Sequence, residues 1–154
     1  MKLKNIYVFF LVFVFSSIII SCNKGSSEEI LWQSYKEGMD TGKKENKKIF
    51  IHFWASWCGY CTKMAKETFK DPLVVSYLNK HFIPVKINSD KQKDIAAVYK
   101  IRGLPDNWFV SEKGEQIVNL PGYVPPDKMY LILQYIDTNS YTTMDFNQFL
   151  NTKN

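Results

Sequence analysis

Cysteine and histidine are scarce in this sequence, with three and two residues among 154. That scarcity excludes a multi-cysteine zinc module and a disulfide-dense scaffold. Charge of one sign is not concentrated: the net charge is +5, and Lys2 and Lys4 at the extreme N-terminus supply part of it. The sequence therefore carries no footprint for nucleic acid, and we expect no nucleic-acid partner. With 45% hydrophobic and 23% charged residues, the composition indicates a globular protein rather than a disordered one.

The N-terminus has the composition of an export signal. Lys2 and Lys4 precede an apolar run over residues 6–20, which is short for a membrane-spanning helix of about 20 residues. The run ends in Ile19-Ile20-Ser21-Cys22, which resembles the bacterial lipobox. The resemblance implies cleavage before Cys22 and acylation of this cysteine. The alternatives are an ordinary cleaved signal with an incidental cysteine and an uncleaved N-terminal anchor.

The segments that we predict follow from this N-terminus. They are a lipoprotein signal peptide over residues 1–21, a lipidated Cys22 with a polar tether over 22–28, one domain over 29–138 and a C-terminal extension over 139–154. More than one acyl chain holds a protein stably on a bilayer. We therefore expect an exported, membrane-anchored lipoprotein that faces the periplasm or the cell exterior.

The apolar pattern of the domain predicts alternating strands and helices. Residues 49–55 form an apolar run broken only by His52, as expected for a parallel strand buried on both faces. The predicted strands cover residues 49–55, 82–88, 108–110 and 115–120, and the predicted helices 58–69, 73–80, 91–99 and 126–136, with a short one within 141–150. This order predicts an α/β fold with a central mixed β-sheet flanked by helices on both faces.

Cys58 and Cys61 carry the chemistry that the sequence indicates. They lie three residues apart at a helix start, so their Cα atoms fall within the ~4.4–6.8 Å that a disulfide requires. The helix N-terminus stabilises a thiolate on Cys58, the predicted nucleophile, and Cys61 is the predicted resolving thiol. The alternatives are a static disulfide, which would be a weak staple because its ring is small, and a metal site that only His52 and His81 could complete.

Two motifs make the chain similar to the thioredoxin family. Residues 53–61, FWASWCGYC, resemble the family's active-site strand and loop, and residues 99–105, YKIRGLP, resemble the approach to its cis-proline. Gly122 matches the glycine after the last strand. The spacing from Cys61 to Asp71-Pro72 is more narrowly similar to exported thioredoxin-like proteins, including the periplasmic C-terminal domain of the transmembrane disulfide reductase. The resemblance implies the thioredoxin fold.

The resemblance also implies a surface for the substrate beside the two cysteines. Pro105 is expected to be cis, which leaves the backbone of Leu104 free to pair with an extended substrate strand. Trp57, Gly59 and Tyr60 are expected to complete this docking surface. The alternative is an ordinary trans proline in a loop.

Two positions depart from the family pattern. His52 stands where the family has a buried acidic residue, while Lys86 matches a lysine that the family places nearby. A neutral imidazole can accept the proton of the resolving Cys61, so His52 and Lys86 are candidate supporting residues; a packed histidine without a catalytic role is the alternative. Asp106 follows the proline where threonine is common, which puts an extra negative charge near the thiols or simply a solvated turn residue there.

These observations predict thiol–disulfide exchange on protein disulfides outside the cytoplasm. No charged residue lies between Cys58 and Cys61 to acidify the thiol strongly, so a reductase or electron relay is favoured over a strong oxidant. The expected partners are protein thiol or disulfide clients, a transmembrane thiol carrier as electron donor, and the membrane through the lipid. No metal or organic cofactor is expected beyond the redox-active Cys58–Cys61 pair. The alternative is a non-catalytic lipoprotein that holds a client on a thioredoxin scaffold.

Overall fold

A four-stranded mixed sheet lies at the centre of the computed structural model, which describes residues 28–153. The strand order is β2-β1-β3-β4. The central strand β1 pairs in parallel with β2 and antiparallel with β3, and β3 pairs antiparallel with β4. The bounds are β1 Ile49–Trp54, β2 Ile83–Asn88, β3 Asp106–Val110 and β4 Gln116–Pro121.

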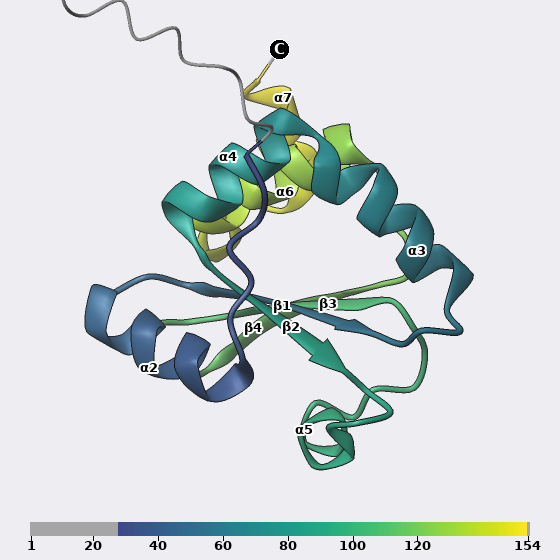
Figure 1. Cartoon of the computed structure of the whole chain (residues 1–154). Helices are drawn as coiled ribbons and strands as arrows, with labels where there is room; N and C mark the ends of the chain where they lie inside the picture. The colour runs from purple at the N-terminus through teal and green to yellow at the C-terminus, as the bar shows by residue number, and fades with distance from the viewer. Residues whose placement is uncertain (1–27, 154) are drawn as a thin grey trace, which may run out of the picture.

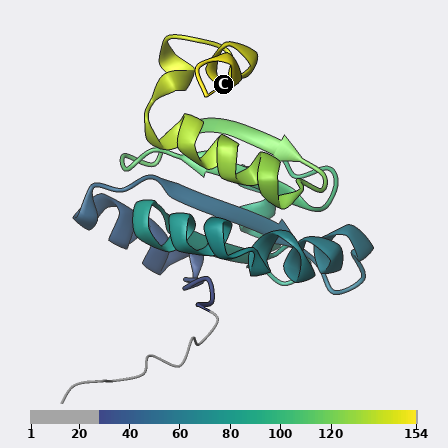
Figure 2. The same ribbon diagram turned by 90° about the horizontal axis from the view of Figure 1, so that it is seen from above.

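Helices cover both faces of this sheet, as the sequence predicts. Figure 1 shows α2 and α5 on one face and α3, α4 and α6 on the other. Viewed from above, α4 and α6 lie side by side (Figure 2). The bounds are α2 Tyr35–Glu45, α3 Gly59–Lys66, α4 Pro72–His81, α5 Lys93–Val98 and α6 Pro126–Asp137, followed by α7 Phe146–Asn151.

Side-chain alternation along β1 divides the core into two layers. Ile49, Ile51 and Phe53 pack with β2 residues in the layer on the α2 side, and Phe50 packs in the layer that includes residues of α4 and α6. The side chain of His52, next on the same face as Phe50, contacts the ring of Phe69 at a centroid separation of 4.8 Å. The prediction that β1 is buried on both faces is confirmed.

Several element boundaries differ by one or two residues from those predicted, and two differences bear on the site. The helix after the cysteines ends at Lys66, and a 3₁₀ turn over Thr68–Lys70 follows it before Asp71 caps α4 through its side chain. The strand β3 begins at Asp106 rather than at residue 108, because Asp106 pairs in register with Phe53 of β1. The interpretation of Asp106 as a solvated turn residue is therefore wrong: only 5% of its surface is exposed.

The C-terminal residues beyond 138 pack on the last helix of the domain. The ring of Tyr135 in α6 lies 5.4 Å from that of Phe146 and 5.2 Å from that of Phe149, between ring centroids. The hydroxyl of Tyr135 donates to the backbone carbonyl of Met144 at 2.6 Å. This aromatic contact attaches α7 to the side of the sheet that α6 covers.

Candidate active site

Cys58 and Cys61 form a disulfide at the start of α3, directly after the loop that follows β1. Their Cα atoms are 5.2 Å apart, within the range that the spacing predicts. Cys58 is the N-cap residue, and its Sγ accepts a hydrogen bond from the backbone N–H of Cys61 at 3.1 Å. That N–H and the helix dipole would stabilise negative charge on the Cys58 sulfur once the disulfide is reduced.

The two cysteines differ in position more than in exposure. In the disulfide form, Cys58 is 5% and Cys61 3% exposed, so exposure does not distinguish the two cysteines. Cys61 lines an inner cavity, described below, whereas Cys58 lies at the helix terminus beside exposed residues. The position at the helix terminus, rather than exposure, is what favours Cys58 as the nucleophile.

An aromatic surface surrounds the disulfide. Trp57 is 70% and Tyr60 65% exposed, and Gly59 between them is also exposed. The indole N–H of Trp57 donates to the carboxylate of Asp90 at 2.9 Å, which holds the ring in place at the end of β2. The structure thus brings these three predicted docking residues together at the rim of the site.

The loop before β3 completes this rim. The Leu104–Pro105 peptide bond is cis, so the prediction for Pro105 is confirmed. Leu104 packs against the cluster formed by Ala55, Cys58 and Cys61. Within residues 28–153, the backbone N–H and C=O of Leu104 make no hydrogen bond, and they remain available to an extended strand from another molecule.

A cavity of about 200 Å³ lies behind Cys61. His52, Trp54, Cys61 and Lys86 line it, so the structure places both predicted supporting residues beside the predicted resolving thiol. The ammonium of Lys86 lies 4.8 Å from the ring centroid of Trp54, and burial lowers the pKa of this lysine. None of the residues that line this cavity is acidic, which leaves Lys86 without the carboxylate partner that the family pattern provides.

A hydrogen bond determines which ring nitrogen of His52 carries a proton. Its Nδ1 lies 2.8 Å from Oδ1 of Asn107, its register partner in β3. The amide nitrogen of Asn107 donates to the backbone carbonyls of Leu120 and Gly122 at 3.2 and 3.4 Å, so its oxygen must face the imidazole. An amide oxygen only accepts, so Nδ1 of His52 carries a proton, and in the neutral ring Nε2 has the lone pair.

Burial shifts the pKa values of His52 and Asp106, the two residues that depart from the family pattern. Burial lowers the pKa of His52 to about 4, with the charge of Lys86 acting in the same direction and the Asn107 hydrogen bond opposing it. The ring is therefore neutral at pH 7. Burial also raises the pKa of Asp106.

Asn107 and Asp90 are site residues that the sequence reasoning missed. Asn107 is fully buried in a strand that is otherwise largely apolar, two residues after the cis-proline, and that contrast was the available signal. The role of Asp90 depends on a contact with Trp57 across 33 positions, which no local pattern reveals. Within residues 28–153, no group of three or more His, Cys, Asp or Glu could hold a metal ion, and no helix is long and apolar enough to cross a membrane.

Comparisons with known proteins agree with this geometry. Residues 35–137 match the family model described as a thioredoxin-like domain. The chain is 39% identical over 84 residues to a thioredoxin of Mycoplasma pneumoniae, a match that covers 54% of this chain and 78% of that protein. It is 33% identical over 89 residues to the thiol:disulfide interchange protein DsbD of Photorhabdus laumondii, covering 56% of this chain and 15% of that protein.

A solved structure shows the same fold. The thioredoxin of Thermus thermophilus superposes with a TM-score of 0.64 at 23% identity, over 70% of this chain and 87% of that one. The strand order and the helix layers described above are thus those of a known fold. Residues 1–34 and 138–154 lie outside the match to the family model.

Proposed function

The chain belongs to the thioredoxin-like family and is a thiol–disulfide oxidoreductase, and we propose that it acts outside the cytoplasm as a reductase or electron relay for protein disulfides. One observation carries this proposal. The Cys58–Cys61 pair lies at the N-terminus of α3, next to a cis-proline loop whose residue Leu104 offers unpaired backbone groups. A reactive dithiol and a strand-binding edge are thereby placed side by side.

The first step is attack on the client. In the reduced protein, the Cys58 thiolate attacks one sulfur of a client disulfide; a mixed disulfide forms, and the other client sulfur leaves as a thiolate. The helix N-terminus stabilises the attacking thiolate. The exposed Trp57 and Tyr60 offer the client an apolar contact area around the reacting sulfur.

The second step releases the client. The Cys61 thiolate attacks Sγ of Cys58, the Cys58–Cys61 disulfide forms, and the second client sulfur leaves as a thiolate. Cys61 must lose its proton first, and Nε2 of neutral His52 in the shared cavity is the acceptor. Lys86 in the same cavity stabilises the thiolate that results.

The oxidised protein then requires a donor of two electrons. The periplasm is kept oxidising, so a reductase there needs a dithiol donor connected to the cytoplasm. The similarity to DsbD, a thiol:disulfide interchange protein, supports a transmembrane thiol carrier as that donor. The chain spans only 15% of that relative, so the similarity does not extend to the rest of that protein. The electron donor is therefore proposed separately from the oxidoreductase activity.

Membrane attachment through Cys22 rests on the sequence alone, since residues 1–27 lie outside the described part of the chain. The expected result is a protein that partitions into detergent, and Cys22→Ser should release it or block its processing. A Cys22→Ser protein that is processed normally and still carries lipid would contradict the lipoprotein assignment.

The activity itself is tested by reduction of a peptide disulfide with dithiothreitol as electron source. Cys58→Ser should abolish reduction, and Cys61→Ser should accumulate mixed disulfides with clients, because the resolving thiol is missing. Trapping by the Cys58→Ser protein through Cys61 would reverse the two roles. A wild-type protein that binds clients but reduces none of them would instead support the client-holding scaffold.

A further inference from the structure

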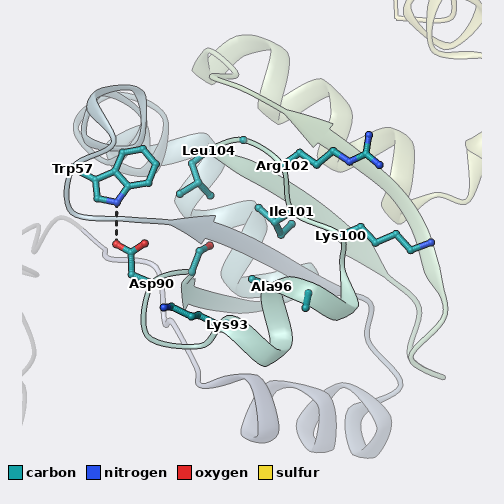
Figure 3. A pocket seen from close by; sticks show the side chains of 11 residues that line it. Trp57, Asp90, Lys93, Ala96, Lys100, Ile101, Arg102 and Leu104 are labelled. Atoms are coloured by element: carbon teal, nitrogen blue, oxygen red, sulfur yellow. Dashed lines mark hydrogen bonds between the residues drawn. The ribbon is translucent and has the colours of Figure 1, made fainter.

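A second cavity, here called the basic groove, borders the docking surface. It lies between α5 and residues 100–104 and has a volume of about 400 Å³. Trp57 stands at one end of it (Figure 3). Ala96, Ala97, Ile101 and Leu104 give it apolar walls, and Leu104 also contacts the cluster around the disulfide. A strand paired with the backbone of Leu104 would therefore pass along this groove.

The charges that line the groove are mostly positive. Lys93, Lys100 and Arg102 are exposed, and none of them forms an ion pair with another residue between 28 and 153. Asp90 is the acidic residue among the lining residues, and its carboxylate accepts the hydrogen bond from Trp57. Figure 3 shows Lys93 on the same side as Asp90, whereas Lys100 and Arg102 extend from the end far from Trp57. At that far end, neither Lys100 nor Arg102 is paired with an acidic residue of the described chain.

Lys100 also has an unusual backbone conformation. Lys100 has a φ of 52°, in the left-handed region where a β-carbon is unfavourable. The two other non-glycine residues with positive φ in the described chain are Asn46 and Asn139, and asparagine is the type that tolerates this region best. The left-handed conformation of Lys100 belongs to the C-terminal cap of α5, where the N–H of Lys100 donates to the carbonyl of Ala97 and the N–H of Ile101 to that of Ala96. This cap holds the lysine beside the cis-proline loop.

We propose that the basic groove binds a client segment that carries acidic side chains a few residues from its reacting cysteine. This inference rests on the proposed function and names the class of client. An extended segment advances about 3.3 Å per residue and alternates its side chains, so a glutamate two or four positions from the cysteine would lie on one face along the groove. Its carboxylate would meet Lys100 and Arg102 after passing the apolar walls.

The expected preference is moderate because these cations are exposed. Ion pairs at exposed sites contribute little individually, and their largest effect is on the rate of association. Two such pairs would raise kcat/KM for an acidic client by about 10-fold over a neutral one at low salt. The preference should shrink at high ionic strength, since salt screens charges at the surface.

The test uses three peptide disulfides that are identical except for the residues two and four positions from the cysteine, which are both Glu, both Gln or both Lys. Wild-type protein should reduce them in the order Glu, Gln, Lys. The double variant Lys100→Gly/Arg102→Gln should lose the preference, with the Glu-to-Gln ratio of kcat/KM falling close to 1. Lys80→Gln/Lys128→Gln removes two exposed cations from α4 and α6, on the other face of the sheet, and should keep the full ratio.

Each outcome has one meaning. Equal kcat/KM for the Glu and Gln peptides in wild-type protein, or a preference that survives in the double variant, overturns the inference while leaving the oxidoreductase activity in place. Failure of wild-type protein to reduce any of the peptides overturns the proposed function instead. The thermal midpoint of the single variant Lys100→Gly serves as the folding control: glycine fits the left-handed backbone, so the midpoint should be unchanged or higher while the preference decreases.

Discussion

Buried, neutral His52 should make the folded protein sensitive to acid. The imidazole is 1% exposed, and burial holds its pKa at about 4, whereas in the unfolded chain it has its ordinary value of about 6.5. Between these two values the unfolded chain binds a proton that the folded chain does not. The free energy of unfolding therefore has its full value above pH 6.5 and decreases as the pH falls toward 4.

The two pKa values give the size of the effect. Integrating the linkage relation between pH 7.5 and pH 4.5 gives a loss of about 2–3 kcal/mol from His52 alone. The matched variant is His52→Gln, because glutamine does not titrate and its amide can still donate to Oδ1 of Asn107. The loss that wild-type protein shows in excess of this variant isolates the contribution of His52 from those of all other titratable groups.

The assay is urea unfolding of the disulfide form of both proteins at pH 7.5 and pH 4.5, analysed as a two-state transition. Wild-type protein should lose about 2–3 kcal/mol more than His52→Gln between these values. If the two proteins lose the same free energy within error, His52 is not a neutral buried group. The fixed tautomer and the role of Nε2 as proton acceptor would then be withdrawn together.

Three further predictions concern the same residues and the C-terminal segment. His52→Leu should slow release of the client from a Cys58 mixed disulfide by about 10²-fold, with the largest deficit at acidic pH. This is the lower end of the range for a general base, because the pKa of His52 is low. Equal single-turnover rates of the two proteins from pH 5 to 9 would make His52 a packing residue. Lys86→Met should make the reduction potential more negative by about 10–30 mV in a glutathione titration, since it removes a cation near the Cys61 thiolate, and a shift in the other direction would contradict this. Phe149→Ala should cost about 3 kcal/mol of unfolding free energy if the α7 contact with α6 belongs to the cooperative core, whereas an unchanged urea midpoint would show that α7 is dispensable.

The active-site strand and helix could be predicted because their signals are local. A continuous apolar run marks β1, and the two cysteines follow it at the spacing of one helical turn. The start of β3 could not be predicted in the same way. Asp106 and Asn107 are polar residues after a proline, a pattern typical of a loop, and they are in a strand because β1 and β4 pair with them on both sides.

The partner of His52 shows the same limit at the level of the site. In the sequence, a histidine stands where the family has a carboxylate. That observation left two possible roles for His52, a general base and a packing residue. The hydrogen bond that fixes its tautomer comes from Asn107, 55 positions away, and exists only because β1 and β3 pair in this register. A single sequence contains no record of that register, so the protonation state of the ring follows only from the three-dimensional structure.

The charges around the disulfide indicate where the protein fits in an electron-transfer chain. Behind Cys61, Lys86 lines a cavity without an acidic residue; at the docking surface, Lys100 and Arg102 are unpaired within the described chain. Of these charges, that of Lys86 shares a cavity with Cys61, and a positive charge there stabilises the thiolate of the reduced form relative to the neutral disulfide. A dithiol stabilised in this way attacks readily at neutral pH, but it is a weaker reductant than one that faces a buried carboxylate. This charge is consistent with the proposed role of a relay, which would accept electrons from a more strongly reducing dithiol and pass them to client disulfides.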